Sequence, residues 1–200
     1  VFGGRSDLKS VVEYDVVRNQ FSIDIYADYK LVAIKLKKVL KKYKIKYLHG
    51  YPSSIYDFAL FCKQDDTVLL NLLSKNLKGV FFGSEYPHNH YRDTIEEVFN
   101  VKTISWYGHT ERAVLAYEKD QNFKYESFNT YGFAEAISID KDNFQLISTS
   151  YDNFASPLIR YNTEDIISDV ESDNDIMKSF NIKKGREGEF VLDKSNKKIN

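Results

Sequence analysis

The chain has 200 residues, of which 42% are hydrophobic and 28% charged, with only 3 prolines. This composition is typical of a globular protein and argues against long disordered tails. Its 28 basic and 29 acidic residues leave a net charge of −1, so no global basic field points to nucleic acid as a partner.

The single cysteine, Cys62, excludes an internal disulfide and a cysteine-cluster metal site within one chain. It lies in an apolar helical run, which predicts a buried, inert thiol. No apolar segment is long enough to span a membrane and no signal-peptide pattern is present, so we expect a cytoplasmic protein without a membrane partner.

The first part of the chain alternates helical and strand patterns. Asp28 can cap a helix whose apolar stripe runs from Val32 to Tyr43. The basic run at 35–46 shares this helix, which favours a solvated face over a patch for nucleic acid or anionic lipid. Three further helices are expected. The first begins after Ser54 as its cap, with Ile55, Phe58, Ala59 and Cys62 facing inward, and the second lies within 66–76. The third carries the apolar stripe Tyr91, Ile95, Val98 and Phe99.

Short apolar strands are expected between these helices, at 44–50, 77–82 and 101–106. Helices that alternate with short strands predict parallel pairing in an α/β sheet. We therefore assign residues 1–122 to an α/β sheet unit.

The pattern changes after about residue 120, where short alternating segments are separated by Asn, Asp and Gly turns. Strands are expected at 123–128, 132–139, 144–151 and 156–161, and a solvated acidic loop at 171–175. These segments predict a small antiparallel sheet or half-barrel over residues 123–181. We assign residues 182–200 to a third segment, which is expected to lead to a hinge.

Three glycine-containing turns follow the expected parallel strands, at 49–54, 83–87 and 107–111. The carboxyl ends of parallel strands meet at one edge of a sheet, where ligands collect. In the third turn Tyr107 offers a stacking face, Thr110 a hydroxyl and Glu111 a carboxylate suited to Mg²⁺. Each turn is a weak signal alone, and together they indicate a binding edge.

These turns carry a resemblance to a known family. "YGHTE" (107–111) resembles the Tyr-Gly-x-Thr-Glu motif of adenylate-forming enzymes, the superfamily of acyl-CoA synthetases. The chain is most similar to the phenylacetate–CoA ligase branch, which includes the CapK-like proteins associated with capsular polysaccharide and the coenzyme F390 synthetases. The segments that carry this similarity are "YLHGYPSSIYDFA" (47–59), "VFFGSEYPHNHYRDTIEEVFN" (80–100), "ASPLIRYNTED" (155–165) and "IKKGREGEF" (182–190).

The resemblance implies an ATP site. Gly83, Ser84 and Glu85 match the loop along adenine. Tyr107 matches the aromatic residue that stacks on the base, with Gly108 permitting the close approach. Thr110 matches the hydroxyl near the α-phosphate and Glu111 the Mg²⁺-binding carboxylate. Asp165 matches the acid that holds the ribose hydroxyls, Arg186 a second ribose-side contact near a hinge, and Tyr51 and Pro52 part of the carboxylate-substrate pocket.

Plainer roles stand beside several of these positions. Asp165 can be a turn residue, Arg186 a surface cation, and Glu85 an acid in the first turn of the following helix. The "HNH" run at 88–90 is expected to be a solvated helix start rather than a metal site. His109 occupies the variable position of its motif, so its role is open.

The chain departs from the family pattern in three respects. Glu164 stands where the motif "TGD" has its glycine. The Ser/Thr/Gly-rich loop that grips the β- and γ-phosphates is not found, and neither is the C-terminal domain with its lysine. We therefore expect an internal fragment, with N-terminal and C-terminal portions of the same protein missing.

The implied activity of the full-length protein is attack of a small-molecule carboxylic acid on ATP. It yields an acyl-adenylate, followed by transfer to CoA or another acceptor. The fragment alone is expected to be inactive. A non-catalytic nucleotide-binding or scaffold protein of a polysaccharide pathway is the alternative, and an α/β glycosyltransferase is a third hypothesis.

Overall fold

The computed structural model describes residues 1–4, 8–182, 191–192 and 198–199. The chain divides into two compact units, Val1–Trp106 and Tyr107–Asn200. This boundary lies earlier than the expected one after residue 122, because β6 (Leu115–Glu118) pairs with β7 (Lys124–Ser127) and so belongs to the antiparallel strands. Within the described residues, no helix is both long and apolar enough to cross a membrane.

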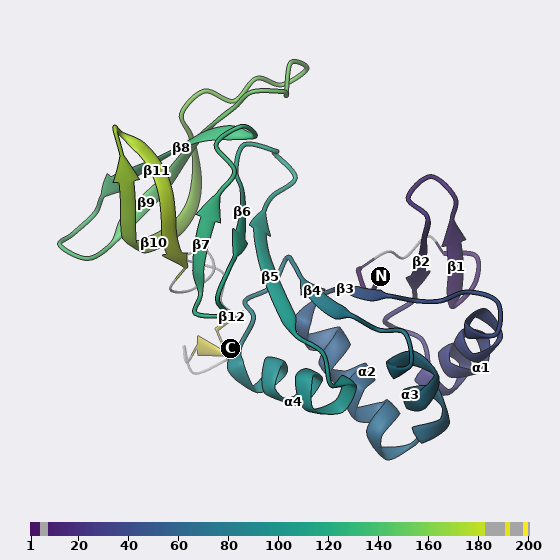
Figure 1. The fold of residues 1–200 in the computed structure, drawn as a ribbon. Helices are drawn as coiled ribbons and strands as arrows, with labels where there is room; N and C mark the ends of the chain where they lie inside the picture. Colours follow the sequence, from purple (N-terminus) through teal and green to yellow (C-terminus); the bar gives the residue numbers. More distant parts are fainter. Residues whose placement is uncertain (5–7, 183–190, 193–197, 200) are drawn as a thin grey trace. The chain divides into compact units, whose positions relative to one another are not determined.

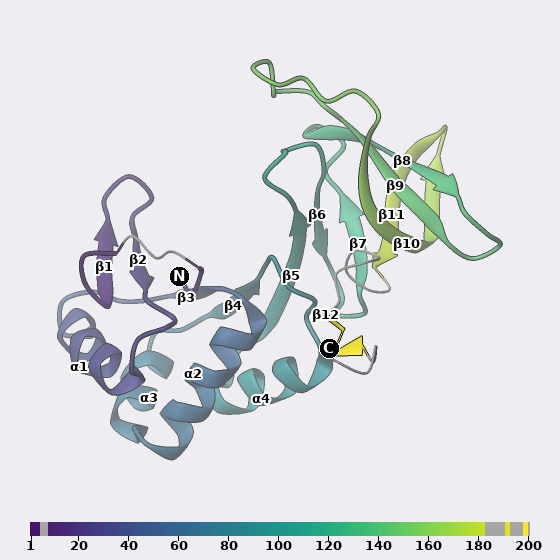
Figure 2. The ribbon, with the colours of Figure 1, turned by 180° about the vertical axis from the view of Figure 1, so that it is seen from behind.

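The first unit contains the predicted parallel strands, β3 (Tyr47–Gly50), β4 (Gly79–Phe82) and β5 (Thr103–Gly108), of which β5 runs across the boundary. Strands β3 and β4 are joined by α2 (Pro52–Gln64) and α3 (Thr67–Ser74), and β4 and β5 by α4 (Asn89–Phe99). Figures 1 and 2 show these helices on one side of the strands. Helix α1 (Tyr29–Leu40) follows an antiparallel hairpin of β1 (Val12–Asp15) and β2 (Gln20–Ile23).

The helices of this unit begin where local chemistry favours it. Asp28 accepts a hydrogen bond from Lys30 N at 2.9 Å and caps α1, as predicted. Asp66 caps α3 by accepting from Leu69 N at 3.0 Å. Ser54 does not cap α2, which starts at Pro52. Proline suits the first helical position because it has no N–H to leave unpaired and its φ is already helical.

One hydrophobic core holds the first unit together. The predicted inward face of α2, made of Ile55, Phe58, Ala59 and Cys62, is buried in it. Helix α1 contributes Val32, Ala33 and Leu36, while its Lys residues lie on the opposite, exposed side or at its end. The helical periodicity of the sequence therefore identified the packed face of α2 and most of that of α1. It was wrong for Tyr43, predicted as the end of the α1 stripe, because α1 ends at Leu40 and Tyr43 is exposed.

The second unit is antiparallel, as predicted. Its strands lie in the order β6, β7, β11 (Ile176–Ile182), β10 (Tyr161–Asp173), β9 (Phe144–Ser150) and β8 (Gly132–Ser138). Strand β8 also approaches β11, so the strands curl toward a barrel. A separate core is formed by Val114, Ala116, Tyr125, Ala134, Leu146, Ile167, Met177 and Phe180. A short antiparallel pair, β12 (Val191–Leu192) with β13 (Lys198–Ile199), ends the chain.

Two expectations for the second unit are wrong. Residues 156–160 form no strand, because Pro157 has no N–H for a ladder and Arg160 has a φ of 50°. The expected acidic loop at 171–175 is the end of β10 followed by a tight turn into β11. Asn174 and Asp175 have φ values of 49° and 64°, as a two-residue hairpin turn requires and as Asn and Asp tolerate.

Candidate functional site

In the first unit, the turns after β3 and β4 lie at the same edge, because the two strands are parallel. Glu85, in the turn after β4, accepts hydrogen bonds from Ser53 N at 3.2 Å and Ser53 Oγ at 2.7 Å. Ser53 is in the first turn of α2, where backbone N–H groups lack helical partners. Glu85 therefore caps α2 and not α4, the helix that follows it in sequence.

Gly83 is required by close packing at this edge. A Cβ at this position would lie 2.7 Å from Cε2 of Trp106. The indole Nε1 of Trp106 in turn donates to Nε2 of His49 at 3.2 Å. The next residue, Ser84, has a φ of 68°, a left-handed conformation that a residue with a Cβ adopts at a cost.

The predicted substrate-pocket residues, Tyr51 and Pro52, form the start of α2. Pro52 is the buried first residue, and Tyr51 is the N-cap residue without a side-chain capping bond. The hydroxyl of Tyr51 lies 3.0 Å from the point where a Cβ on Gly4 would stand. The role of these two residues in binding a substrate stays a prediction.

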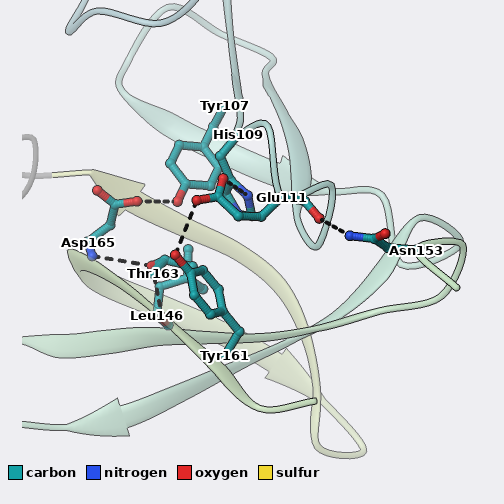
Figure 3. A network of polar contacts seen from close by, with 8 residues as sticks. All are labelled: Tyr107, His109, Glu111, Leu146, Asn153, Tyr161, Thr163 and Asp165. Carbon is teal, nitrogen blue, oxygen red and sulfur yellow. Dashed lines mark hydrogen bonds and ion pairs between the residues drawn. The ribbon is translucent and has the colours of Figure 1, made fainter. Parts of the chain in front are cut away.

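The second unit brings together three of the residues predicted for the nucleotide (Figure 3). Tyr107, at the end of β5, donates from its hydroxyl to Oδ2 of Asp165 at 2.5 Å. The Tyr107 ring makes edge-to-face contacts with Phe180 and Tyr125, with angles of 87° and 68° between the ring planes. The core of the unit thus fixes the tyrosine, and the tyrosine fixes the carboxylate.

Glu111 lies beside this pair in the same network (Figure 3). Its Oε1 accepts from the Tyr161 hydroxyl at 3.2 Å, and its Oε2 lies 3.3 Å from Nδ1 of His109. The carboxylate is 32% exposed, whereas the imidazole of His109 is only 9% exposed. The Asn153 side chain donates to the backbone carbonyl of Glu111 at 3.3 Å. Both carboxylate oxygens are therefore oriented, and the group still reaches solvent.

The direction of the Asp165 side chain depends on a local irregularity in β10. The register between β10 and β9 shifts between Asn162 and Ile166. Within this bulge Thr163 is buried, donates to the Leu146 carbonyl at 2.9 Å, and accepts from Asp165 N at 3.2 Å. Glu164 takes a φ of 64°. Bulges redirect side chains in this way, and here the bulge turns the carboxylate toward Tyr107.

For most of the remaining predicted residues the structure gives a position but, among the described residues, no contact with this network. Gly108 is the last residue of β5, and Thr110 is exposed in the turn that follows. Arg186 lies outside the described residues, so its ribose-side role stays a prediction. His88 is the N-cap residue of α4, and His90 is in its first turn.

Sequence reasoning missed Tyr161 and Thr163 as parts of the site, and left His109 without a role. Tyr161 and Thr163 both lie in the motif "ASPLIRYNTED", two residues apart and beside Asp165. Their position in that motif was a usable signal. The contact between His109 and Glu111 depends on the turn formed by residues 109–112, which Arg112 N closes by donating to the His109 carbonyl at 3.1 Å.

A magnesium ion fits Glu111 only together with a substrate. Within the part of the chain that the structure describes, no group of three or more His, Cys, Asp or Glu residues can hold a metal. Mg²⁺ is commonly bound by one or two carboxylates, with substrate phosphates and water completing its shell. Glu111, oriented and partly exposed, suits that arrangement as the single protein ligand.

Comparison with known proteins gives similarity in structure alone. No protein-family model and no curated protein sequence matches the chain. Among solved structures, an open conformation of 2-hydroxyisobutyryl-CoA ligase in complex with 2-HIB-AMP and CoA matches with a TM-score of 0.62 and 16% identity, over 90% of this chain and 44% of that one. A malonyl-CoA ligase with methylmalonyl-CoA and AMP bound matches at 0.52 and 15%, over 84% and 39%.

Coronafacic acid ligase from Pectobacterium brasiliense matches with a TM-score of 0.51 and 14% identity, over 84% of this chain and 34% of that one. The chain thus spans less than half the length of each of these ligases. At such low identity the comparison bears on the fold and not on the activity. The chain has the mixed α/β fold of part of a domain of adenylate-forming acid–CoA ligases.

Proposed function

We propose that this chain is part of an adenylate-forming ligase that activates a carboxylic acid with ATP. The observation that carries the proposal is the network of Tyr107, Glu111 and Asp165, which meet in the second unit although Asp165 is far from the others in sequence. A fold shared with ligases bound to AMP and to adenylates supports the same conclusion.

In this proposal Asp165 binds the ribose. A carboxylate offers about four lone-pair sites, and Tyr107 uses one of them, on Oδ2. Oδ1 makes no hydrogen bond with the described residues, so it can accept from one hydroxyl while Oδ2 accepts from the next. The Tyr107 ring stacks on the base, and the Tyr107–Asp165 bond keeps the two contacts at a fixed separation.

Glu111 is the proposed ligand of Mg²⁺. The ion supplies charge stabilisation to the phosphates. Tyr161 and His109 orient the Glu111 carboxylate, and because this carboxylate is partly exposed, it can accept a cation from solvent. Thr110, in the exposed turn between Tyr107 and Glu111, is proposed to donate a hydrogen bond from its hydroxyl near the α-phosphate.

Transfer of the acyl group to CoA is the proposed second half of the reaction, since the structural neighbours are ligases that bind CoA or acyl-CoA. The phenylacetate–CoA ligase and CapK-like branch, and with it a role in capsular polysaccharide synthesis, rest on the sequence motifs.

The test uses the complete gene product and two substitutions. Glu111→Gln keeps the size of the side chain and removes its charge, so we expect slower adenylation at saturating ATP, because the metal is needed most as charge develops on the phosphates. Tyr107→Ala removes stacking, which contributes on the order of 1–3 kcal/mol per base, so we expect ATP binding weakened roughly 10- to 100-fold. Single-turnover rates and ATP-titration midpoints separate the two effects.

Glu171→Gln is the matched control, since this carboxylate lies in the same strand as Asp165 but contacts Lys124 and Ser179. It should leave both quantities unchanged. Normal adenylation by Glu111→Gln would remove its metal role. A gene product that binds ATP but catalyses no ATP–pyrophosphate exchange with any acid would support the alternative, a nucleotide-binding scaffold.

A further inference from the structure

His109 contacts both pairs of side chains that make up the network in Figure 3. One pair is Tyr107 with Asp165, and the other is Tyr161 with Glu111. The imidazole is only 9% exposed, so its neighbours restrict its orientation. His109 occupies the variable position of the Tyr-Gly-x-Thr-Glu motif, which gives it no role. Its contacts with the two pairs supply one.

The first set of contacts is made by the ring as a whole. The His109 and Tyr107 ring centroids lie 6.1 Å apart, with an angle of 79° between the ring planes. The Tyr161 ring lies 6.4 Å from His109 at an angle of 53°. Edge-to-face arrangements of this kind are favourable for aromatic rings. Because Tyr107 is also held from the core of the unit, the contact from His109 further restricts the tilt of its ring.

The second contact is made by one nitrogen of the same imidazole. Nδ1 of His109 lies 3.3 Å from Oε2 of Glu111, while the Tyr161 hydroxyl donates to Oε1 at 3.2 Å. Each carboxylate oxygen is thus contacted by a different residue. A partly exposed side chain that is already oriented loses less conformational freedom when it binds a cation. Residues that orient a metal-binding carboxylate strengthen metal binding for this reason.

We propose that His109 is a positioning residue that aligns the base-stacking ring of Tyr107 with the metal-binding carboxylate of Glu111. It acts through these two side chains and not on the reacting atoms. Different parts of the imidazole do the two tasks, since the ring packs against Tyr107 and Nδ1 contacts Glu111. The inference rests on the proposed function, in which Tyr107 stacks on adenine and Glu111 binds Mg²⁺.

Two substitutions separate the two tasks. His109→Phe keeps an aromatic ring beside Tyr107 and removes the nitrogen that faces Glu111. His109→Asn does the reverse, because its side-chain amide nitrogen is as many bonds from Cα as Nδ1 of histidine, but it has no ring. Each variant tests one contact by itself, so a loss of folding in one, detected by circular dichroism, leaves the other informative.

The measurement is the dissociation constant of ATP for the complete gene product by calorimetry, first with EDTA and then with excess Mg²⁺. His109→Asn should weaken binding in EDTA by about 2- to 10-fold, the scale of one aromatic ring pair. It should keep the gain in affinity that Mg²⁺ brings. His109→Phe should bind normally in EDTA and lose about 2- to 5-fold of that gain, the scale of a partly exposed polar contact with a charge.

Tyr117→Phe is the matched control, because the Tyr117 hydroxyl donates to Oε2 of Glu126 at 2.6 Å, outside this network. It should change neither quantity. Equal changes of both quantities in the two His109 variants would indicate a merely structural role and overturn the inference. A larger Mg²⁺ gain in His109→Phe would overturn it too, since His109 would then compete with the cation. If the unsubstituted protein binds no ATP, the proposed function itself fails, and the inference fails with it.

Discussion

Glu164 occupies a backbone conformation that suits glycine, and its replacement by glycine should stabilise the second unit. Its φ is 64°, and a left-handed conformation costs an L-residue roughly 1–2 kcal/mol. Asn and Asp offset this with short polar side chains, whereas Glu is longer. Glycine gives back about 0.5–1 kcal/mol through its freer unfolded state. Glu164→Gly should therefore raise the free energy of unfolding by about 0.5–1 kcal/mol.

The measurement is the thermal midpoint of the chain by circular dichroism. For a chain of this size the expected gain corresponds to roughly 1–4 °C. Residue 164 donates its backbone N–H to the Asn162 side chain at 2.9 Å. This bond does not involve the Glu164 side chain, so it persists in the variant. Glu164→Ala is the matched control, because it removes the charge beside Asp165 and keeps the strain. Equal gains in both variants would show that charge, not backbone strain, is the cause, and a loss in Glu164→Gly would refute the reasoning.

Three titratable groups of the first unit give the remaining predictions. Burial lowers the pKa of the Val1 amine from 8.0 to about 6, so the unfolded state binds more protons between these two pH values. The free energy of unfolding should therefore be highest above pH 8 and fall by about 2–3 kcal/mol as the pH drops from 8 through 6. Urea titrations of a chain made to begin at Val1 would measure this fall, and acetylation of the amine should abolish it. Burial, with a smaller contribution from the Val1 amine, also lowers the pKa of His49, so stability should fall further below pH 6.5 and His49→Gln should flatten that part of the curve. Burial raises the pKa of the Cys62 thiol to about 12, so a disulfide reagent at pH 8 should modify Cys62 only after unfolding; rapid labelling of the folded chain would contradict this.

The α/β part of the fold could be predicted because its signals are local. Asp28 precedes an apolar stripe of helical period, and the faces of α1 and α2 follow from spacing alone. The start of α2 was misplaced at Ser54 because two local rules competed. A serine favours the cap, but proline at the first position of a helix fixes the backbone, and the proline determined the boundary.

The antiparallel part was predictable in class but not in order. Strand β7 pairs with β11 rather than with β8, the next strand along the chain. That choice depends on packing around Tyr125 and Phe180, which stack with ring centroids 6.0 Å apart. No local pattern encodes such a pairing, so the sequence predicts the strands and leaves their neighbours open.

The candidate site shows the same division between local and non-local information. Tyr107 and Glu111 lie in one turn and were found from it. Asp165 reaches them only through the bulge in β10, which depends on pairing with β9 and on the buried hydroxyl of Thr163. The motif that contains Asp165 could suggest the residue, but not the hydrogen bond that joins it to Tyr107.

The residues that match the motifs of the family differ in how much they indicate about function. Gly83 is required by Trp106 and Glu85 caps α2, so each would be needed by this fold even if no nucleotide were bound. Glu111 is different, because its carboxylate is partly exposed and its contacts with Tyr161 and His109 complete no helix or strand. An exposed, oriented carboxylate contributes little to stability. The case for nucleotide chemistry therefore depends on Glu111 and its neighbours in the second unit, and a substitution of Glu111, which should spare the fold, is the informative one.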